Sequence, residues 1–172
     1  MLVTCPHAGP IAPETVAALD ASGFPWQAAD VSGAPTSYTR LLECLWAAGE
    51  PFAVVEHDIV PHPGALAELE ACDRPWCAFG YPYLGGTHAG LGCARFSAAL
   101  LAAVPNAVER TWAESTNVHP PGFWCQLDDR LSRSLRRAGY ASHVHGPPVT
   151  HLSPMPSHGC TDLRGDPAWQ RS

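Results

Sequence analysis

The stretch FAVVEHDIVPHPG, residues 52–64, decides the fold, because four apolar residues are followed at once by Glu56, His57 and Asp58. A short run that is apolar at every position is typical of a central strand covered on both faces. In open α/β sheets, ligands bind at the carboxyl ends of the strands. We therefore expect residues 52–55 to lie in the middle of a sheet, and the polar residues after them to border a binding site.

Outward from this strand, strand-like and helix-like segments alternate along the chain. Further strands are expected at 2–5, 26–31, 76–80, 142–145 and 149–152. Helices are expected at 13–19, from Ser37 to Gly49, around Leu66 and Leu69, at 96–104, and after Gly122. This alternation predicts an α/β domain with a mostly parallel sheet and helices on both of its faces.

The charge of the chain limits its partners. The formal net charge is -6 and only ten basic residues occur, none of them Lys. A broad nucleic-acid surface needs clustered basic side chains, so general DNA binding is disfavoured. The main group of basic residues lies on the last helix. We interpret it as an exposed helix face, and contact with an anionic partner is the alternative. Its members are Arg130, Arg133, Arg136 and Arg137.

The cysteine content and hydropathy indicate the compartment. Seven cysteines are an odd number, and the first residues do not read as an export signal,. No apolar run reaches the roughly 18 residues that a membrane span needs. We expect a cytoplasmic protein without a membrane span, and we expect no structural disulfides.

Glu56 and Asp58 form the first cluster that could carry chemistry. If the strand continued through them, alternation would place both carboxylates on one side and His57 on the other. Carboxylates at the end of a buried strand are costly unless something pairs with them, and a hard divalent cation is a natural partner. The alternative is a polar strand end that caps the next turn.

Asp128 and Asp129 form the second cluster, about a turn into the last helix and beside its apolar stripe. A partly buried acid there is a reasonable general base, whereas an acid in the first turn can also simply interact with the helix dipole. His151 closes the last strand as a metal ligand or as a hydrogen-bonded structural residue. His143, His145 and His158 share this region and indicate a second site or no site at all.

The order of these features resembles the GT-A glycosyltransferases, whose pattern is a D-x-D motif, a glycine loop, an x-E-D motif and a C-terminal His. The resemblance runs from about Tyr38 to Leu152. It implies a single GT-A-like, Rossmann-like domain over residues 1–172. Within it, 1–60 would be the nucleotide-binding half, 61–155 the acceptor and catalytic half, and 156–172 a C-terminal tail.

The resemblance also implies roles for the metal and the donor. Asp58 and His151 would bind Mn²⁺ or Mg²⁺, and Glu56 would contact the ribose or the water shell of the metal. Asp30 would hold the nucleobase or ribose, with Arg40 as a weaker candidate for the same pocket. The loop Gly90-Leu91-Gly92 would let backbone approach the donor sugar, since glycine has no Cβ,.

The reaction implied by the resemblance is a direct displacement at the anomeric carbon of a nucleotide-sugar, with UDP as the expected nucleotide. Asp129 would deprotonate the acceptor hydroxyl, which gives inversion, and Asp128 would contact donor or acceptor hydroxyls. The acceptor stays open between a glycan, a protein, a small molecule and a modified DNA base. The oligomeric state is open as well.

Two other classes compete with this interpretation. A metal-dependent hydrolase could use Cys72, Cys77 and Cys93 with several His as ligands, although their spacing fits no familiar zinc signature. A non-catalytic sugar-binding module with the same fold could use some of the six Trp as stacking platforms,. Trp46, Trp76 and Trp124 sit at core-like positions, so burial explains them more simply.

Overall fold

The computed structural model describes residues 1–83, 86–113, 127–146 and 148–152. Its strands are β1 Leu2–His7, β2 Trp26–Asp30, β3 Phe52–Val55, β4 Ile59–Pro61, β5 Trp76–Phe79, β6 Tyr81–Tyr83, β7 Gly86–His88, β8 Cys93–Phe96, β9 His143–His145 and β10 Val149–His151. Its helices are α1 Pro13–Ala21, α2 Ser37–Ala48, α3 Ala65–Ala71, α4 Ala98–Ala103, α5 Glu109–Ala113 and α6 Leu127–Arg137. None of the described helices is long and apolar enough to span a membrane.

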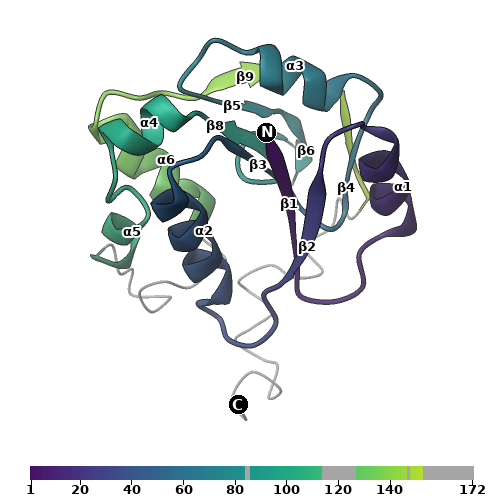
Figure 1. The fold of residues 1–172 in the computed structure, drawn as a ribbon, viewed down its shortest axis with the longest axis horizontal. Helices are drawn as coiled ribbons and strands as arrows, with labels where there is room; N and C mark the ends of the chain where they lie inside the picture. The colour runs from purple at the N-terminus through teal and green to yellow at the C-terminus, as the bar shows by residue number, and fades with distance from the viewer. Residues whose placement is uncertain (84–85, 114–126, 147, 153–172) are drawn as a thin grey trace.

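Six strands form the central sheet in the order β2-β1-β3-β8-β5-β9 (Figure 1). β1 pairs in parallel with β2 and β3, and β5 pairs in parallel with β9. β3 is therefore an internal strand, as its apolar sequence predicts. Strands from both predicted halves of the chain share this one sheet, so the halves are built on a common core. Two small sheets, β4 with β10 and β6 with β7, complete the strand pairing.

β8 is the strand of the central sheet that the sequence pattern did not predict. We expected a helix to begin at Phe96, but Cys93–Phe96 is a strand that pairs antiparallel with both β3 and β5. The helix begins only after Ser97, whose hydroxyl accepts a hydrogen bond from the Leu100 amide at 3.2 Å. Four residues that follow a glycine-rich run are too few for periodicity to separate a strand from a helix start. The sheet is consequently mixed, although mostly parallel.

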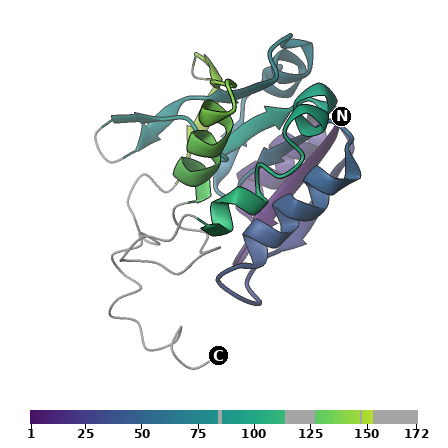
Figure 2. The ribbon, with the colours of Figure 1, turned by 90° about the vertical axis from the view of Figure 1, so that its left-hand side faces the viewer.

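The sheet is covered on both faces, and β3 shows how the sequence divides between them. Phe52 and Val54 belong to the core under α2, α4 and α6, whereas Ala53 and Val55 belong to the core under α1 and α3. Figure 2 shows α2 and α6 lying on the same side of the sheet. The four residues are at most 2% exposed. This alternation confirms the predicted arrangement of helices on both faces.

Aromatic rings fill the first of these two cores. The Phe96 ring lies 5.3 Å from that of Trp46, 5.1 Å from that of Phe52 and 5.6 Å from that of Trp76, between centroids. Trp46 and Trp76 are 4% and 3% exposed, so burial is confirmed as their role and stacking on a sugar is excluded for both. Trp124 lies outside the described residues.

β1 is longer than the sequence suggests, because it continues through Pro6 to His7. The amides of Val3 and of alternate residues after it point toward β2, which places the Pro6 nitrogen on the β3 side. β3 pairs with β1 only as far as Thr4. Proline therefore costs no ladder hydrogen bond at this position, and the strand does not end there.

The basic group on α6 is divided by the fold. Arg133, Arg136 and Arg137 are exposed, as an exposed helix face requires, but Arg130 is only 1% exposed. Arg130 lies next to Leu131 on the face that packs onto the sheet, so the prediction of a fully exposed basic face was wrong for this residue. The remaining arginines form the exposed part of the group.

Candidate functional site

The E-H-D segment is a turn rather than a continuation of β3. The strand ends at Val55, and the Glu56 carbonyl accepts a hydrogen bond from the Ile59 amide at 3.0 Å. The Glu56 amide donates to the Gly92 carbonyl at 2.9 Å, and the His57 carbonyl accepts from the Ala12 amide at 3.0 Å. The expected strand-like alternation was therefore wrong, and the backbone of the turn is fixed on two sides.

Asp58 and His151 meet beside this turn, although they are 93 residues apart in sequence. β10 pairs antiparallel with β4 and places His151 opposite Ile59, and the Leu152 amide donates to the Asp58 carbonyl at 2.9 Å. The His151 Nε2 lies 3.1 Å from the Asp58 Oδ2, with side chains 10% and 17% exposed. The structure thus brings together the two residues that the sequence analysis assigned to one cation.

Glu56 is the most strongly perturbed acid of the site. Burial, the negative charge of Asp128 and the negative charge of Asp58 raise the pKa of Glu56 to about 8. The Tyr38 hydroxyl donates to the Glu56 Oε1 at 3.1 Å and opposes part of this rise. Three carboxyl groups therefore share one partly buried region, the acid site, which we define as Glu56, Asp58, Asp128 and His151. Such a concentration of negative charge attracts a cation.

Asp58 behaves differently from Glu56. Burial acts to raise its pKa, but the hydrogen bond with His151 and the nearby His57 outweigh burial, so the net pKa of Asp58 is lowered. Asp58 is consequently ionised at neutral pH while Glu56 is mostly protonated. The same site holds one permanent carboxylate and one that a bound cation could ionise.

Tyr38 is a site residue that the sequence analysis assigned only to the core. Its ring does pack in the core, at 6% exposed, because it belongs to the apolar stripe of α2. Burial and the charges of Glu56 and Asp128 raise the pKa of Tyr38 well above its usual value. A tyrosine in a stripe otherwise made of Leu was the available signal, since a buried hydroxyl needs a partner.

The two acids of α6 have different environments. Asp128 is half-buried, and its charge reaches both Glu56 and Tyr38. Asp129 is exposed. The apolar stripe through Leu127 and Leu131 is buried as predicted and turns Asp128 toward the acid site. Of the pair, Asp128 is the residue whose charge acts on Glu56, whereas Asp129 is exposed to solvent.

The glycine loop forms part of the wall of this site. Gly90 and Leu91 line a small recess together with Asp128, and Leu91 is a core residue at 2% exposed. A Cβ on Gly92 would lie 2.5 Å from Cε1 of Tyr81, whose ring centroid lies 5.1 Å from that of His151 at an interplanar angle of 54°. The structural reason for Gly92 is thus the close approach of Tyr81.

The two residues expected in the nucleotide pocket lie apart from these contacts. Asp30 is exposed at the end of β2, and its Oδ1 accepts a hydrogen bond from the Ser32 amide at 2.8 Å. Hydrogen bonds with the Ser32 side chain and the Ser32 amide lower the pKa of Asp30. The Arg40 guanidinium lies 5.1 Å from the ring centroid of Trp112 and 4.0 Å from Glu43. These contacts hold Arg40 on the α5 side of α2.

The remaining candidates fall into two groups. His143 and His145 lie on β9 close to Cys72, while Cys93 is buried in β8, where burial raises its pKa. His158 lies outside the described residues. Among the described residues, Cys93 is therefore separate from the group of Cys72, His143 and His145, and the hydrolase interpretation loses that ligand.

Known structures share this fold. No protein-family model and no curated protein sequence matches the chain. A glycosyltransferase involved in the glycosylation of the major capsid of PBCV-1 is similar in structure with a TM-score of 0.58 and 10% identity, over 95% of this chain and 98% of that one. A197 from STIV is similar with a TM-score of 0.54 and 10% identity, over 86% and 82%. The chain therefore has a GT-A-like fold, as expected.

Proposed function

We propose that this protein is a metal-dependent glycosyltransferase that moves a sugar from a nucleotide-sugar, with UDP as the nucleotide, to a hydroxyl acceptor. The observation that carries the proposal is the convergence of Asp58 and His151 at 3.1 Å, beside Glu56 and Asp128. This convergence lies at the carboxyl end of an internal strand, where α/β sheets bind ligands. The shared fold with a glycosyltransferase supports the same reaction class.

The residues of the acid site fit a hard divalent cation. Carboxylate oxygens and an imidazole suit Mn²⁺ and Mg²⁺. Burial, followed by the charges of Asp128 and Asp58, raises the pKa of Glu56, and a cation would offset the charges,. Asp58 and His151 would be the protein ligands, with Glu56 contacting the water shell or the ribose. A cation bound there would neutralise charge on the departing diphosphate.

The chain itself would supply the proton acceptor. Asp129 is exposed and can receive the proton of an acceptor hydroxyl that arrives from solvent, which gives inversion,. Asp128 faces the acid site and would orient the donor. Gly90-Leu91-Gly92 would border the donor sugar, and Asp30, with Arg40 as the weaker candidate, would hold the nucleotide. We place this reaction in the cytoplasm, since the five described cysteines are free thiols.

Donor binding provides the first test. Nucleotide-sugars are screened by thermal unfolding of the full chain with Mn²⁺ or with a chelator. A donor at 100 times its Kd should stabilise the protein by about 2.7 kcal/mol. Asp58→Asn should lose the metal-dependent part of this effect, because the cation loses its carboxylate. Asp73→Asn is the matched control, since the Asp73 side chain is 92% exposed and outside the acid site.

The outcome separates a transferase from a sugar-binding module. A transferase should also cleave or transfer from the bound donor, and only with Mn²⁺ or Mg²⁺. Stabilisation by a donor that is equal with metal and with chelator would contradict the proposal, as would full metal-dependent stabilisation of Asp58→Asn. Candidate acceptors, from glycans and proteins to small molecules and modified DNA bases, can then be compared with the identified donor.

A further inference from the structure

Three ligand atoms that the acid site does not use come together at the β9 edge of the sheet. Cys72, His143 and His145 each offer one sulfur or ring nitrogen, and these atoms lie within 4.8 Å of one another. No other His, Cys, Asp or Glu group of three in the described ranges meets this distance. These three residues are the Cys–His cluster.

The pairing of β9 with β5 places His143 and His145 on the same face of the sheet,. β9 pairs in parallel with β5, so that His143 lies opposite Cys77 and His145 opposite Phe79. Alternate residues of a strand share one face, and this face is the one that α3 covers,. Cys72 is the C-cap of α3, which ends directly above the same edge. The end of α3 therefore supplies the thiol of the cluster, and the edge strand β9 supplies its two imidazoles.

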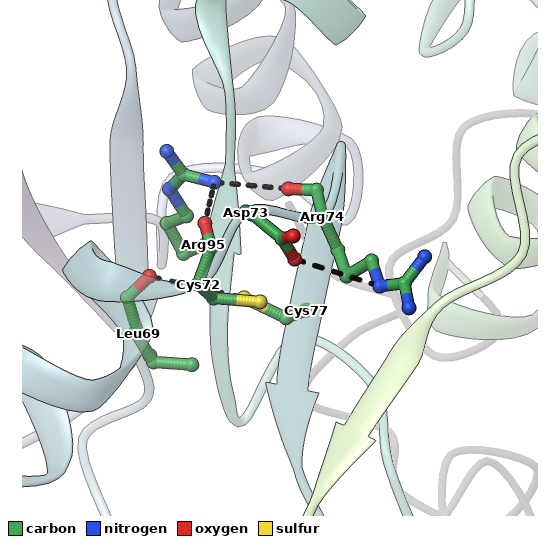
Figure 3. A network of polar contacts seen from close by, with 6 residues as sticks. All are labelled: Leu69, Cys72, Asp73, Arg74, Cys77 and Arg95. Atoms are coloured by element: carbon green, nitrogen blue, oxygen red, sulfur yellow. Dashed lines mark hydrogen bonds and ion pairs between the residues drawn. The ribbon is translucent and has the colours of Figure 1, made fainter.

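The backbone of Cys72 is held in place by a hydrogen bond from the Arg95 side chain (Figure 3). Arg95 Nη1 donates to the Cys72 carbonyl at 3.2 Å and to the Arg74 carbonyl at 3.0 Å. Figure 3 also shows the sulfurs of Cys72 and Cys77 next to one another. Cys77 is fully buried and directs its Sγ to the Leu69 carbonyl at 3.9 Å, whereas Cys72 is half-buried. Cys72 is thus the thiol that an ion from solvent can reach.

His145 has the hydrogen bonding of a metal ligand. Its Nδ1 lies 2.7 Å from Glu68 Oε1, and an ionised carboxylate only accepts, so Nδ1 carries a proton,. In the neutral ring that a metal ion binds, Nε2 then keeps its lone pair. The Nε2 atom is buried and has no hydrogen-bond partner among the described residues. Buried polar atoms normally have a partner, and ligating histidines typically donate their other nitrogen to a carboxylate.

We propose that the Cys–His cluster is a second metal site, specific for a transition-metal ion of the Zn²⁺ type, with Cys72 Sγ, His143 and His145 Nε2 as ligands. Sulfur and imidazole favour Zn²⁺, whereas Mn²⁺ and Mg²⁺ favour oxygen ligands. Three protein ligands leave the fourth tetrahedral position to water, and the exposed His143 gives that position access to solvent,. This site stands independently of the glycosyltransferase proposal.

Co²⁺ is the spectroscopic probe for this site. The reduced full chain, stripped with a chelator, is titrated with Co²⁺ and then with Zn²⁺. We expect a saturable visible spectrum with a thiolate-to-cobalt charge-transfer band, which Zn²⁺ displaces. Cys72→Ser should remove the charge-transfer band. Glu68→Gln should weaken Co²⁺ binding about 10- to 100-fold, because it removes the partner of a ligating histidine.

Matched controls define the site. Cys44→Ser and His62→Asn change exposed residues outside the cluster and should leave the spectrum unchanged. Asp58→Asn should also leave it unchanged, which separates this site from the acid site. An unaltered spectrum in Cys72→Ser would overturn the proposal, and so would a Cys72 to Cys77 disulfide in protein kept under reductant. Circular dichroism verifies the fold of each variant, and His143→Asn, at an exposed position, provides a second ligand variant.

Discussion

The acid site and the Cys–His cluster are built from different parts of one sheet. The acid site follows the internal strand β3, where carboxylates are partly buried and their charges interact. The Cys–His cluster lies on the edge strand β9, where His143 is exposed and one ring nitrogen of His145 lacks a hydrogen-bond partner within the described chain. One region gathers oxygen ligands and negative charge, and the other gathers sulfur and nitrogen ligands.

This difference indicates that the position of a site in the sheet determines which types of metal ligand gather there. Next to an internal strand, burial and the charges of Asp128 and Asp58 raise the pKa of Glu56, so a proton or a bound cation must balance this carboxyl group,. At the edge, two imidazoles and a thiol lie with their ligand atoms within 4.8 Å of one another. Hard and soft ions should therefore bind to separate places in the same domain.

The largest effect is expected from the exposed acid beside the acid site. Asp129→Asn should lower the turnover of a donor and acceptor pair by about 100- to 10,000-fold, the usual contribution of a general base. Donor binding should stay intact, because the metal ligands are untouched. Steady-state kinetics and thermal shift on the same sample measure both. Full transfer by Asp129→Asn would show that the base is elsewhere, and Asp128→Asn is the next variant to compare.

The pH dependence of stability tests whether burial and the neighbouring acids raise the pKa of Glu56. The pKa of Glu56 is raised in the folded state to about 8, so its contribution to stability is present below the ordinary pKa of 4.5 and is lost as the pH rises toward 8. In chelator, the free energy of unfolding should fall by up to about 1.4 kcal/mol per pH unit within that window. Urea unfolding at several pH values measures the slope.

Glu56→Gln is the matched variant for this slope. Glutamine keeps the size of the side chain and cannot ionise, so the decline between pH 4.5 and 8 should flatten,. An identical slope in the variant would mean that another group titrates.

The packing of the loop at Gly92 should have a smaller effect. Gly92→Ala places a Cβ 2.5 Å from the Tyr81 ring, and overpacking of this kind costs about 1–3 kcal/mol of stability,. Because the Tyr81 ring packs against that of His151, metal affinity at the acid site should weaken as well, while cobalt binding at the edge should not. Gly9→Ala is the control, since a Cβ there meets nothing within 4 Å. Unchanged stability of Gly92→Ala would contradict the tight contact.

The smallest change to the protein is needed to compare the reactivity of the cysteine thiols in the two regions. Burial and the charges of Glu56 and Asp58 raise the pKa of Cys5 to about 12, so this thiol should not react with iodoacetamide in the native protein near pH 8,. Cys44 is exposed and should react first. Zn²⁺ should protect Cys72 and leave the labelling of Cys44 unchanged. Mass spectrometry of peptides follows each site, and fast native labelling of Cys5 would contradict its burial.

Local patterns in the sequence predict much of the fold. The run at 52–55 indicates an internal strand, and the periodicity of Leu127, Leu131 and Leu135 indicates the buried face of α6, as the structure has it. β8 and the turn at 56–58 were not predictable in this way. Both are short, and their conformation depends on partners far away in sequence, such as the Gly92 carbonyl that binds the Glu56 amide.

The residues of the candidate sites also divide into those that the sequence predicted and those that it did not. Asp58 and His151 could be assigned as a pair through the order of motifs, yet Tyr38 could not be identified as a partner of Glu56 because its position also fits the core. Arg40 was expected near the nucleotide, but its contact with Trp112 is formed between helices α2 and α5. The relation of Cys72 to His143 and His145 was equally hidden, since their spacing follows no familiar motif.

By itself, the sequence determined the fold class, the internal position of β3 and the types of residue available for chemistry, because apolar periodicity and residue type are local properties of the chain. The tertiary structure alone decided which acids share a charge, which arginine is buried and which sulfur lies beside which imidazole. These properties depend on distances across the sheet and on the exclusion of water, and neither quantity is encoded in neighbouring residues.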